Sequence, residues 1–257
     1  MIKVSIIGSG NVAQHLISAF KAVQKAGAKL ELVEVYSRKK ETVTHLVEQD
    51  QITTSINDLK EADIYIIAVS DDAIASVAQQ LPFKNRLVVH TSGSVSVDVI
   101  ADTNRKGVFY PLQSFTKNKA VDFTTIPICL EAENATDYQL IDALAKLISP
   151  KVFAINSQQR RALHVAAVFV NNFTNHLYQI GKSICDENQI PFAILHPLIN
   201  ETAQKIASLT PSQAQTGPAI RQDEKTIATH QDFLSNEEHL HIYKILTQAI
   251  QNNGKEL

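Results

Sequence analysis

The sequence predicts an α/β fold, in which a doubly wound and mainly parallel sheet is followed by an all-α domain. Three observations lead to this prediction. Short, almost wholly apolar segments alternate with helix-like segments as far as Ile155, a pattern typical of parallel strands that helices cover on both faces. A glycine-rich turn joins the first strand to the first helix. From about residue 157 the pattern is helical, and no convincing strand follows.

The glycine-rich turn comes after the first predicted strand, Lys3–Ile7, and spans Gly8–Ala13. Gly8 permits a tight turn, Gly10 lets the backbone approach a pyrophosphate, and Ala13 lets the next helix pack closely on the strand. Free N–H groups at the start of that helix can bind phosphates. The pattern predicts a dinucleotide site of the Rossmann type, with a tight turn in another kind of α/β protein as the alternative. The predicted contacts in this turn are Gly8, Gly10, Asn11 and Val12.

The remaining strands and helices of the first half follow in order. Ser70, Asp71 and Asp72 stand where their side chains can cap a helix. Apolar segments predict strands at 30–36, 63–69, 87–90, 107–110, 126–130 and 152–155, and helices between them at 39–49, 73–80 and 137–148.

The second half contains helical patterns alone. Their predicted ranges are 158–188, 193–209, 226–234 and 237–251. Ser235 and Glu238 have the spacing of a capping box at the start of the last helix. The change of pattern near residue 156 predicts two domains, a dinucleotide-binding domain at 1–156 and a helical domain at 157–257.

Composition narrows the range of partners and compartments. The chain has 257 residues, 44% of them hydrophobic and 19% charged, which is typical of a globular protein. A net charge of −2 favours neither nucleic acid nor an anionic membrane as partner, and no apolar stretch approaches a membrane span. Cys129 and Cys185 form no metal or redox motif, and the first strand leaves no room for a signal peptide. A cytoplasmic location is the expectation.

The residues after the second strand indicate which dinucleotide binds. An NAD-preferring site usually has Asp or Glu here, bound to the ribose 2′-hydroxyl. This sequence has Tyr36, Ser37 and Arg38, followed by two lysines. Arg38 can make paired N–H contacts to a 2′-phosphate. NADP is therefore the predicted cofactor, with Ser37 and Arg38 as contacts, and a solvated basic start to the next helix is the alternative.

Two further strands end in polar residues at the same edge of the predicted sheet. Val69 and Ser70 end one strand, and Thr91 and Ser92 follow His90 at the end of the next. Ligands of open α/β sheets bind at this carboxyl edge. Val69, Ser70, Thr91 and Ser92 are therefore predicted cofactor contacts. A capping role for Thr91 and Ser94 is the alternative.

Candidate catalytic residues lie in the helical half. His164 and Asn171 are seven residues apart, close to two helical turns, and fall on one polar stripe of a helix that its apolar residues predict to be buried. A small-molecule substrate would satisfy that stripe, and a structural hydrogen-bond network is the alternative. Arg221, in an irregular segment, can bind a carboxylate or pair with Asp223. The histidines show no metal-ligand spacing, and no metal is predicted.

Five segments together resemble a known family. They are Gly8–Ala13, Ala68–Asp72, His90–Gly93, Pro111–Phe115 and Thr216–Arg221. In this order they resemble the bacterial Rossmann-like proteins that carry a C-terminal DUF2520 domain and are often described as NADP oxidoreductases. More distantly, the chain is similar to pyrroline-5-carboxylate reductases, β-hydroxyacid dehydrogenases and deazaflavin-dependent NADP reductases.

The resemblance implies a helical C-terminal domain like that of 6-phosphogluconate dehydrogenase, which would bind substrate and form a homodimer. It implies no particular substrate. One departure is clear, because β-hydroxyacid dehydrogenases have a catalytic Lys on the first interdomain helix, whereas the matching segment here has none before Lys182. The proton donor would then be His164, another residue or water, with Asn171 orienting the substrate and Arg221 holding an anionic group.

Three functions agree with these observations. The first is an NADP-dependent oxidoreductase that transfers a hydride to or from a small carbonyl or imine. The second is a non-catalytic NADP(H)-binding sensor or scaffold protein, which the missing Lys favours. The third is a Rossmann-type domain that binds no dinucleotide.

Overall fold

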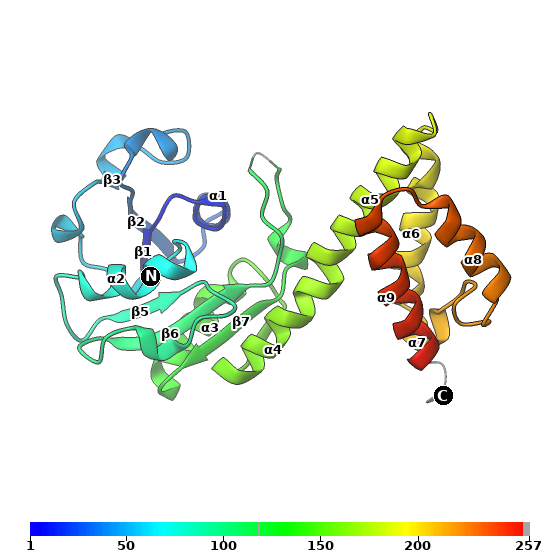
Figure 1. Cartoon of the computed structure of the whole chain (residues 1–257). Coiled ribbons are helices and arrows are strands. Elements are labelled where there is room, and N and C mark those ends of the chain that lie inside the picture. The colour runs from blue at the N-terminus through cyan, green and yellow to red at the C-terminus, as the bar shows by residue number, and fades with distance from the viewer. Residues whose placement is uncertain (118, 254–257) are drawn as a thin grey trace. The chain divides into compact units, whose positions relative to one another are not determined.

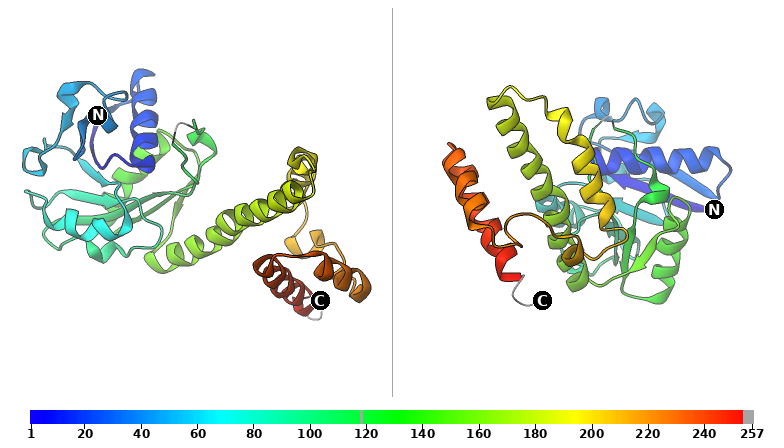
Figure 2. Two further views of the ribbon diagram at one scale, coloured as in Figure 1. Left: turned by 45° about the horizontal axis from the view of Figure 1, so that its top comes forward. Right: turned by 90° about the vertical axis from the view of Figure 1, so that its right-hand side faces the viewer.

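The computed structural model describes residues 1–117 and 119–253 (Figure 1). The chain divides into two compact units, Met1–Asn171 and Asn172–Leu257. The first contains the sheet, and the second contains helices, coloured yellow to red in Figures 1 and 2. Among the described residues, no helix is long and apolar enough to cross a membrane.

The strands of the described residues form one eight-stranded sheet in the order β3-β2-β1-β4-β5-β6-β7-β8. All neighbours pair in parallel except β6 and β7, which are antiparallel. The order reverses between β1 and β4, which is the switch point where ligands of such sheets bind. The bounds are β1 Ile2–Ile7, β2 Leu30–Tyr36, β3 Ile52–Thr53, β4 Ile64–Ile67, β5 Leu87–His90, β6 Arg105–Pro111, β7 Ile128–Ala132 and β8 Val152–Ala154.

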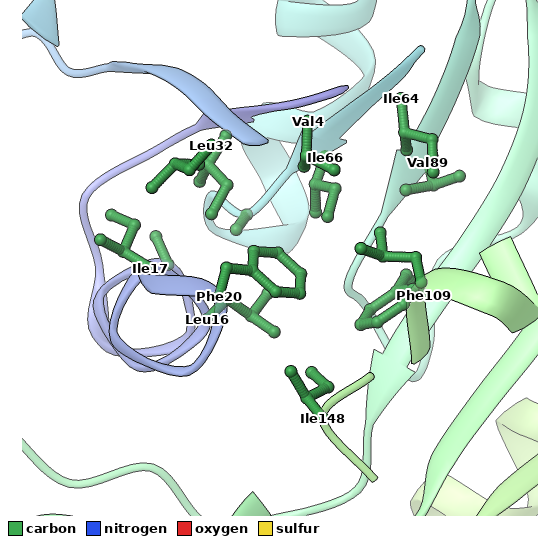
Figure 3. Close-up of a cluster of buried hydrophobic side chains, with 14 of the residues drawn as sticks. Val4, Leu16, Ile17, Phe20, Leu32, Ile64, Ile66, Val89, Phe109 and Ile148 are labelled. Atoms are coloured by element: carbon green, nitrogen blue, oxygen red, sulfur yellow. The ribbon is translucent and has the colours of Figure 1, made fainter. Parts of the chain in front are cut away.

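Helices cover both faces of the sheet, as the apolar strands predict. Successive residues of β1 show this, because Ile6 belongs to the core under α1 and α3, and Ile7 belongs to the core under α2. Leu16, Ile17 and Phe20 of α1 are fully buried against the sheet (Figure 3). The helices are α1 Asn11–Lys25, α2 Asp71–Gln79 and α3 Ala135–Lys146.

The helix predicted at 39–49 is wrong. In its place are short 3-10 turns at Lys40–Thr42 and Gln49–Gln51, and they lead into β3, which the sequence analysis missed. Val43 and Val47 are both buried and are four residues apart, which is the spacing of the buried face of a helix. The Ser37 hydroxyl donates to the Lys39 carbonyl (2.8 Å) and holds the chain in a turn instead.

The helix predicted at 158–188 is not a continuous α-helix. It consists of α4 Ser157–Ala167, a π-helical stretch Val168–Phe173 and α5 Thr174–Glu187. Since a π-helix has more residues per turn, seven residues no longer make two α-helical turns. The expected burial is also wrong, because apolar side chains such as Val165 (54%) and Val170 (74%) are exposed.

The described part of the second unit contains the α-helices α5 to α9 and a 3-10 turn at Phe192–Leu195. Asn236 caps α9 by accepting from the backbone N–H of His239 (3.0 Å), so the capping box predicted at Ser235 is wrong. Apolar residues of α5, α8 and α9 line a cavity of about 310 Å³. The helices are α6 His196–Lys205, α7 Pro211–Ala214, α8 Glu224–Phe233 and α9 Glu237–Asn253.

Candidate functional site

A pocket of about 680 Å³ lies at the carboxyl ends of β1, β2 and β4. Of the predicted cofactor contacts, all but Thr91 and Ser92 line it. The lining residues among the predicted contacts are Gly8, Gly10, Asn11, Val12, Ser37, Arg38, Val69 and Ser70.

The two glycines of the turn differ in whether the fold requires them. Gly8 has φ +136°, and a Cβ there would lie 2.2 Å from the Ala68 carbonyl oxygen, so β4 passes too close for any side chain. Gly10 has ordinary extended backbone, and a Cβ there would meet nothing within 4 Å. No side chain caps α1. An uncapped helix N-terminus beside an open glycine fits the phosphates of a dinucleotide.

The loop after β6 forms another wall of the pocket. The Asn11 side-chain amide donates to the Phe115 carbonyl (3.0 Å), and His15 Nε2 lies 3.1 Å from the Thr116 carbonyl. The His15 and Phe115 rings lie 5.0 Å apart. Gln113 and Phe115 thereby line the pocket. Asn11 therefore uses its side chain to hold this wall, so its backbone is what remains for a ligand.

The residues predicted to bind a 2′-phosphate differ in accessibility. The Ser37 hydroxyl is buried, and besides donating to Lys39 it lies 3.0 Å from the Thr42 hydroxyl. Arg38 is exposed and lines the pocket. Glu34, the nearest carboxylate on β2, is buried and accepts from the backbone N–H of Lys60. Arg38 is thus the group of this segment that fits an anionic ligand.

Thr91 and Ser92 are buried and shape the loop after β5. The Thr91 backbone N–H donates to the Ile67 carbonyl (3.2 Å). The Ser92 hydroxyl oxygen accepts from the backbone N–H groups of Ser94 and Val95, each at 3.1 Å. These bonds give both residues a structural role in the loop, and their contact with a cofactor stays a prediction.

His90, at the end of β5, is fully buried and neutral. Its Nδ1 accepts from the Ser92 backbone N–H (3.2 Å), which places its proton on Nε2. Nε2 has no hydrogen-bond partner among the described residues. Burial, and then the charge of Arg160, lower the pKa of His90 to about 4.

His164 contacts the same edge of the sheet. Its Nδ1 lies 3.1 Å from the hydroxyl of Tyr110 on β6, and the two rings meet edge to face. A Cβ on Gly93 would lie 2.6 Å from His164 Nδ1 and 2.8 Å from the Tyr110 hydroxyl, so the pair needs glycine at this position. The predicted acid therefore stands beside the loop that carries Thr91 and Ser92.

A buried ion pair holds α4 in this place. Arg160 is 1% exposed and pairs with Glu131 of β7. It also donates to the Val95 carbonyl (2.6 Å) and to the Ser157 hydroxyl (3.1 Å). The sequence analysis missed this pair, because no local pattern distinguishes Arg160 from the exposed Arg161 beside it.

Asn171 and Arg221 remain predictions. Asn171 is exposed in the π-helical stretch at the end of the first unit. Arg221 is exposed in the second unit. Hydrogen bonds from Thr226, and to a lesser extent the charge of Arg221, lower the pKa of Asp223, which caps α8. No group of three or more His, Cys, Asp or Glu that could hold a metal occurs within residues 1–117 and 119–253.

Two family models match the sequence. Residues 3–94 match "NADP oxidoreductase coenzyme F420-dependent", and residues 126–250 match a domain of unknown function, DUF2520. No curated protein matches the chain.

Several solved structures are similar over nearly the whole chain. A "putative NADP oxidoreductase" from Bacteroides fragilis is 36% identical, with a TM-score of 0.86 and 98% of each chain covered. A reductive aminase from Aspergillus terreus, in complex with NADPH and ethyl-5-oxohexanoate, is 13% identical, with a TM-score of 0.72 and coverage of 99% and 95%. A pyrroline carboxylate reductase from Plasmodium falciparum with NADP bound is 12% identical, with a TM-score of 0.58 and coverage of 99% and 97%. At 13% and 12% identity, the last two similarities show a shared fold alone.

Proposed function

The chain belongs to the family in which an NADP oxidoreductase domain is followed by a DUF2520 domain, and from this premise we propose that it transfers a hydride between NADP(H) and a small carbonyl or imine metabolite. The observation that supports this most directly is the pocket at the β1–β4 switch point, with the open Gly10 and the uncapped start of α1. Similarity to reductases whose structures hold NADPH or NADP agrees with it.

The pocket residues have distinct roles in this proposal. The backbone from Gly8 to Val12 binds the pyrophosphate, and Arg38 pairs with the 2′-phosphate, which favours NADP over NAD. Val69 and Ser70 border the path toward the nicotinamide, and Thr91 and Ser92 shape the loop beside it. When bound, the dinucleotide supplies or accepts the hydride.

His164 is the proposed proton donor for reduction. Reduction of a carbonyl or imine adds a proton to oxygen or nitrogen as hydride reaches carbon, and an imidazole suits this exchange near neutral pH. Its contacts with Tyr110 and Gly93 support the assignment, because they hold the ring at the ligand-binding edge of the sheet. Asn171 orients the substrate and Arg221 binds an anionic group on it.

Replacing His164 by Gln or Ala tests the assignment. We expect kcat for NADPH oxidation to fall about 10²–10⁴-fold, the usual contribution of a general acid, while the Kd for NADPH changes little. The assay uses a panel of carbonyls and imines, with and without a carboxylate, and His241→Gln on α9 is the control. Turnover of His164→Gln at the wild-type rate would contradict the role of His164.

One observation favours a second candidate, an NADP(H)-binding sensor without turnover. The helical segment that carries His164 has no Lys before Lys182, where distant dehydrogenases have a catalytic one. Calorimetry separates the candidates: tight NADPH binding, with no oxidation across the whole panel, would favour the sensor. Failure to bind NADPH, or to be stabilised by it in excess, would contradict both.

We further propose that the protein is a cytoplasmic homodimer associated through the helical domain, 157–257. Apolar side chains that are exposed in residues 157–257 support the dimer, since monomeric proteins rarely expose so many large apolar side chains to solvent. Buried, unbridged Cys129 and Cys185 agree with a reducing compartment. Light scattering on the purified protein measures the oligomeric state. The exposed residues include Val165, Val170, Ile194, Leu198 and Ile245.

A further inference from the structure

Tyr110 and His164 form a side-chain pair that three elements hold in place. Tyr110 is on β6 and His164 is on α4, while Gly93, in the loop after β5, leaves the space in which their polar atoms meet. The hydroxyl and Nδ1 lie 3.1 Å apart. The network of Arg160 fixes both sides of the contact, because it ties α4 to β7 and to Val95 of the same loop.

The Tyr110 hydroxyl remains protonated at neutral pH. Burial raises its pKa to about 12, and the buried Cys129 thiol also raises it, whereas the charge of Arg160 acts the other way and that of Asp71 raises it slightly. The oxygen of a protonated hydroxyl can accept from Nδ1–H of a neutral imidazole. It can also accept from Nδ1–H when the imidazole is charged.

We propose that Tyr110 is the positioning residue that makes Nε2 of His164 the nitrogen through which the reaction exchanges its proton. The inference rests on the proposed function, and it adds the residue that sets the tautomer and orientation of the acid. Because the hydroxyl oxygen accepts from Nδ1–H whether the imidazole is neutral or charged, the ring keeps its orientation before and after proton transfer.

In reduction, the substrate carbon gains the hydride, and the π pair of C=O or C=N moves to the oxygen or nitrogen. That atom takes the Nε2 proton of the imidazolium, which leaves a neutral ring with its remaining proton on Nδ1, donating to the Tyr110 oxygen. Solvent then returns a proton to the ring. Oxidation of the product reverses each step.

Tyr110→Phe tests the inference without changing the size of the ring. We expect kcat to fall about tenfold or more while KM and the Kd for NADPH stay close to wild type. The matched control is Tyr243→Phe, which removes the hydroxyl from a similar pair in the second unit, where the Tyr243 hydroxyl lies 2.9 Å from His230 Nδ1.

A double-variant cycle separates positioning from general support of the fold. If Tyr110 acts through His164, adding Tyr110→Phe to His164→Gln lowers kcat no further, because the acid is already absent. A hydroxyl that only supports the fold lowers kcat in both backgrounds, and that result overturns the inference.

The tautomer of His164 gives a readout that needs no turnover. Imidazole ¹⁵N shifts of the wild-type protein should show the neutral ring protonated on Nδ1, which leaves Nε2 free to exchange the proton, and Tyr110→Phe should show a mixture of tautomers. An unchanged tautomer in Tyr110→Phe overturns the inference whatever the turnover. If the tautomer changes as expected but the protein turns over no substrate, the role of Tyr110 stands and only the proposed function is contradicted.

Discussion

Gly8 and Gly10 are two residues apart in one turn, yet only Gly8 is a glycine that the fold itself requires. Gly8 needs it for the fold, because its φ is positive and Ala68 fills the place of a Cβ. In the proposed function Gly10 serves the ligand, because its backbone is ordinary and the space beside it is open. The sequence motif alone cannot separate these roles, since both positions match it equally well.

Alanine substitutions separate the two requirements. We expect Gly8→Ala to lower the free energy of unfolding by about 2 kcal/mol or more, from backbone strain and the contact with Ala68. Gly10→Ala should unfold close to wild type but bind NADPH more weakly, because a methyl group would occupy the approach to the backbone. Urea unfolding and calorimetry measure the two effects. A Gly10→Ala variant with unchanged NADPH affinity would show that no phosphate approaches there.

The burial of His90 predicts that the free energy of unfolding depends on pH. Its pKa is lowered from 6.5 to about 4 in the folded protein. The unfolded chain therefore binds more protons below pH 6.5, so the free energy of unfolding is highest above 6.5 and falls as the pH drops toward 4. The contribution is about 3 kcal/mol in all.

His90→Asn should remove that part of the pH dependence. Its side-chain oxygen can still accept from the Ser92 N–H, but it does not titrate. We expect a flatter stability profile between pH 7 and about pH 5 in urea titrations. The exposed His45 provides the control His45→Asn, which should keep the wild-type slope. If stability fell with pH at the same slope in the wild type and both variants, the pKa of His90 would not be lowered in the folded protein.

Among the secondary-structure elements, the buried ones were predictable and the irregular ones were not. The strands 30–36 and 87–90 were predicted with their observed bounds, because closely spaced apolar residues mark both segments as largely buried strands. The segment 39–49 was wrongly predicted as a helix, because two buried valines at helical spacing, Val43 and Val47, lie in a segment of short turns. The π-helical stretch left no mark in the pattern of apolar residues.

The candidate site divides in the same way. Residues of one local sequence motif, such as Gly8–Val12, line a single pocket. Side chains that meet across elements, such as Tyr110 with His164 and Arg160 with Glu131, were not predicted as pairs. Their partners are 54 and 29 residues apart, and only the packed sheet brings them together.

For the whole molecule, the family boundaries and the compact units do not coincide. The DUF2520 match begins at residue 126, and so includes β7, α3 and β8, which complete the sheet of the first unit. The boundary predicted near 156 falls at the start of α4, just before the residues that pair with Glu131. The first turns of α4 therefore stabilise the nucleotide-binding unit, whichever family model they match.

Two fragments test this division. Both 1–171 and 1–156 contain all the residues that line the pocket at the switch point, but only the longer one keeps Arg160 and Ser157. We expect 1–171 to fold and to bind NADPH about as tightly as the full chain. The shorter fragment should be less stable by about 2 kcal/mol or more, because Glu131 and the Val95 carbonyl lose a buried partner.

Thermal unfolding and NADPH titration of both fragments and of Arg160→Met in the full chain measure this contribution. Arg160→Met keeps much of the side-chain volume and removes the charge, so it should reproduce most of the loss in stability seen in 1–156. Equal stability of the two fragments would place the boundary at 156. If 1–171 folds but binds no NADPH while the full chain does, the pocket depends on the second unit, and the backbone of Gly8–Val12 is not sufficient to hold the dinucleotide.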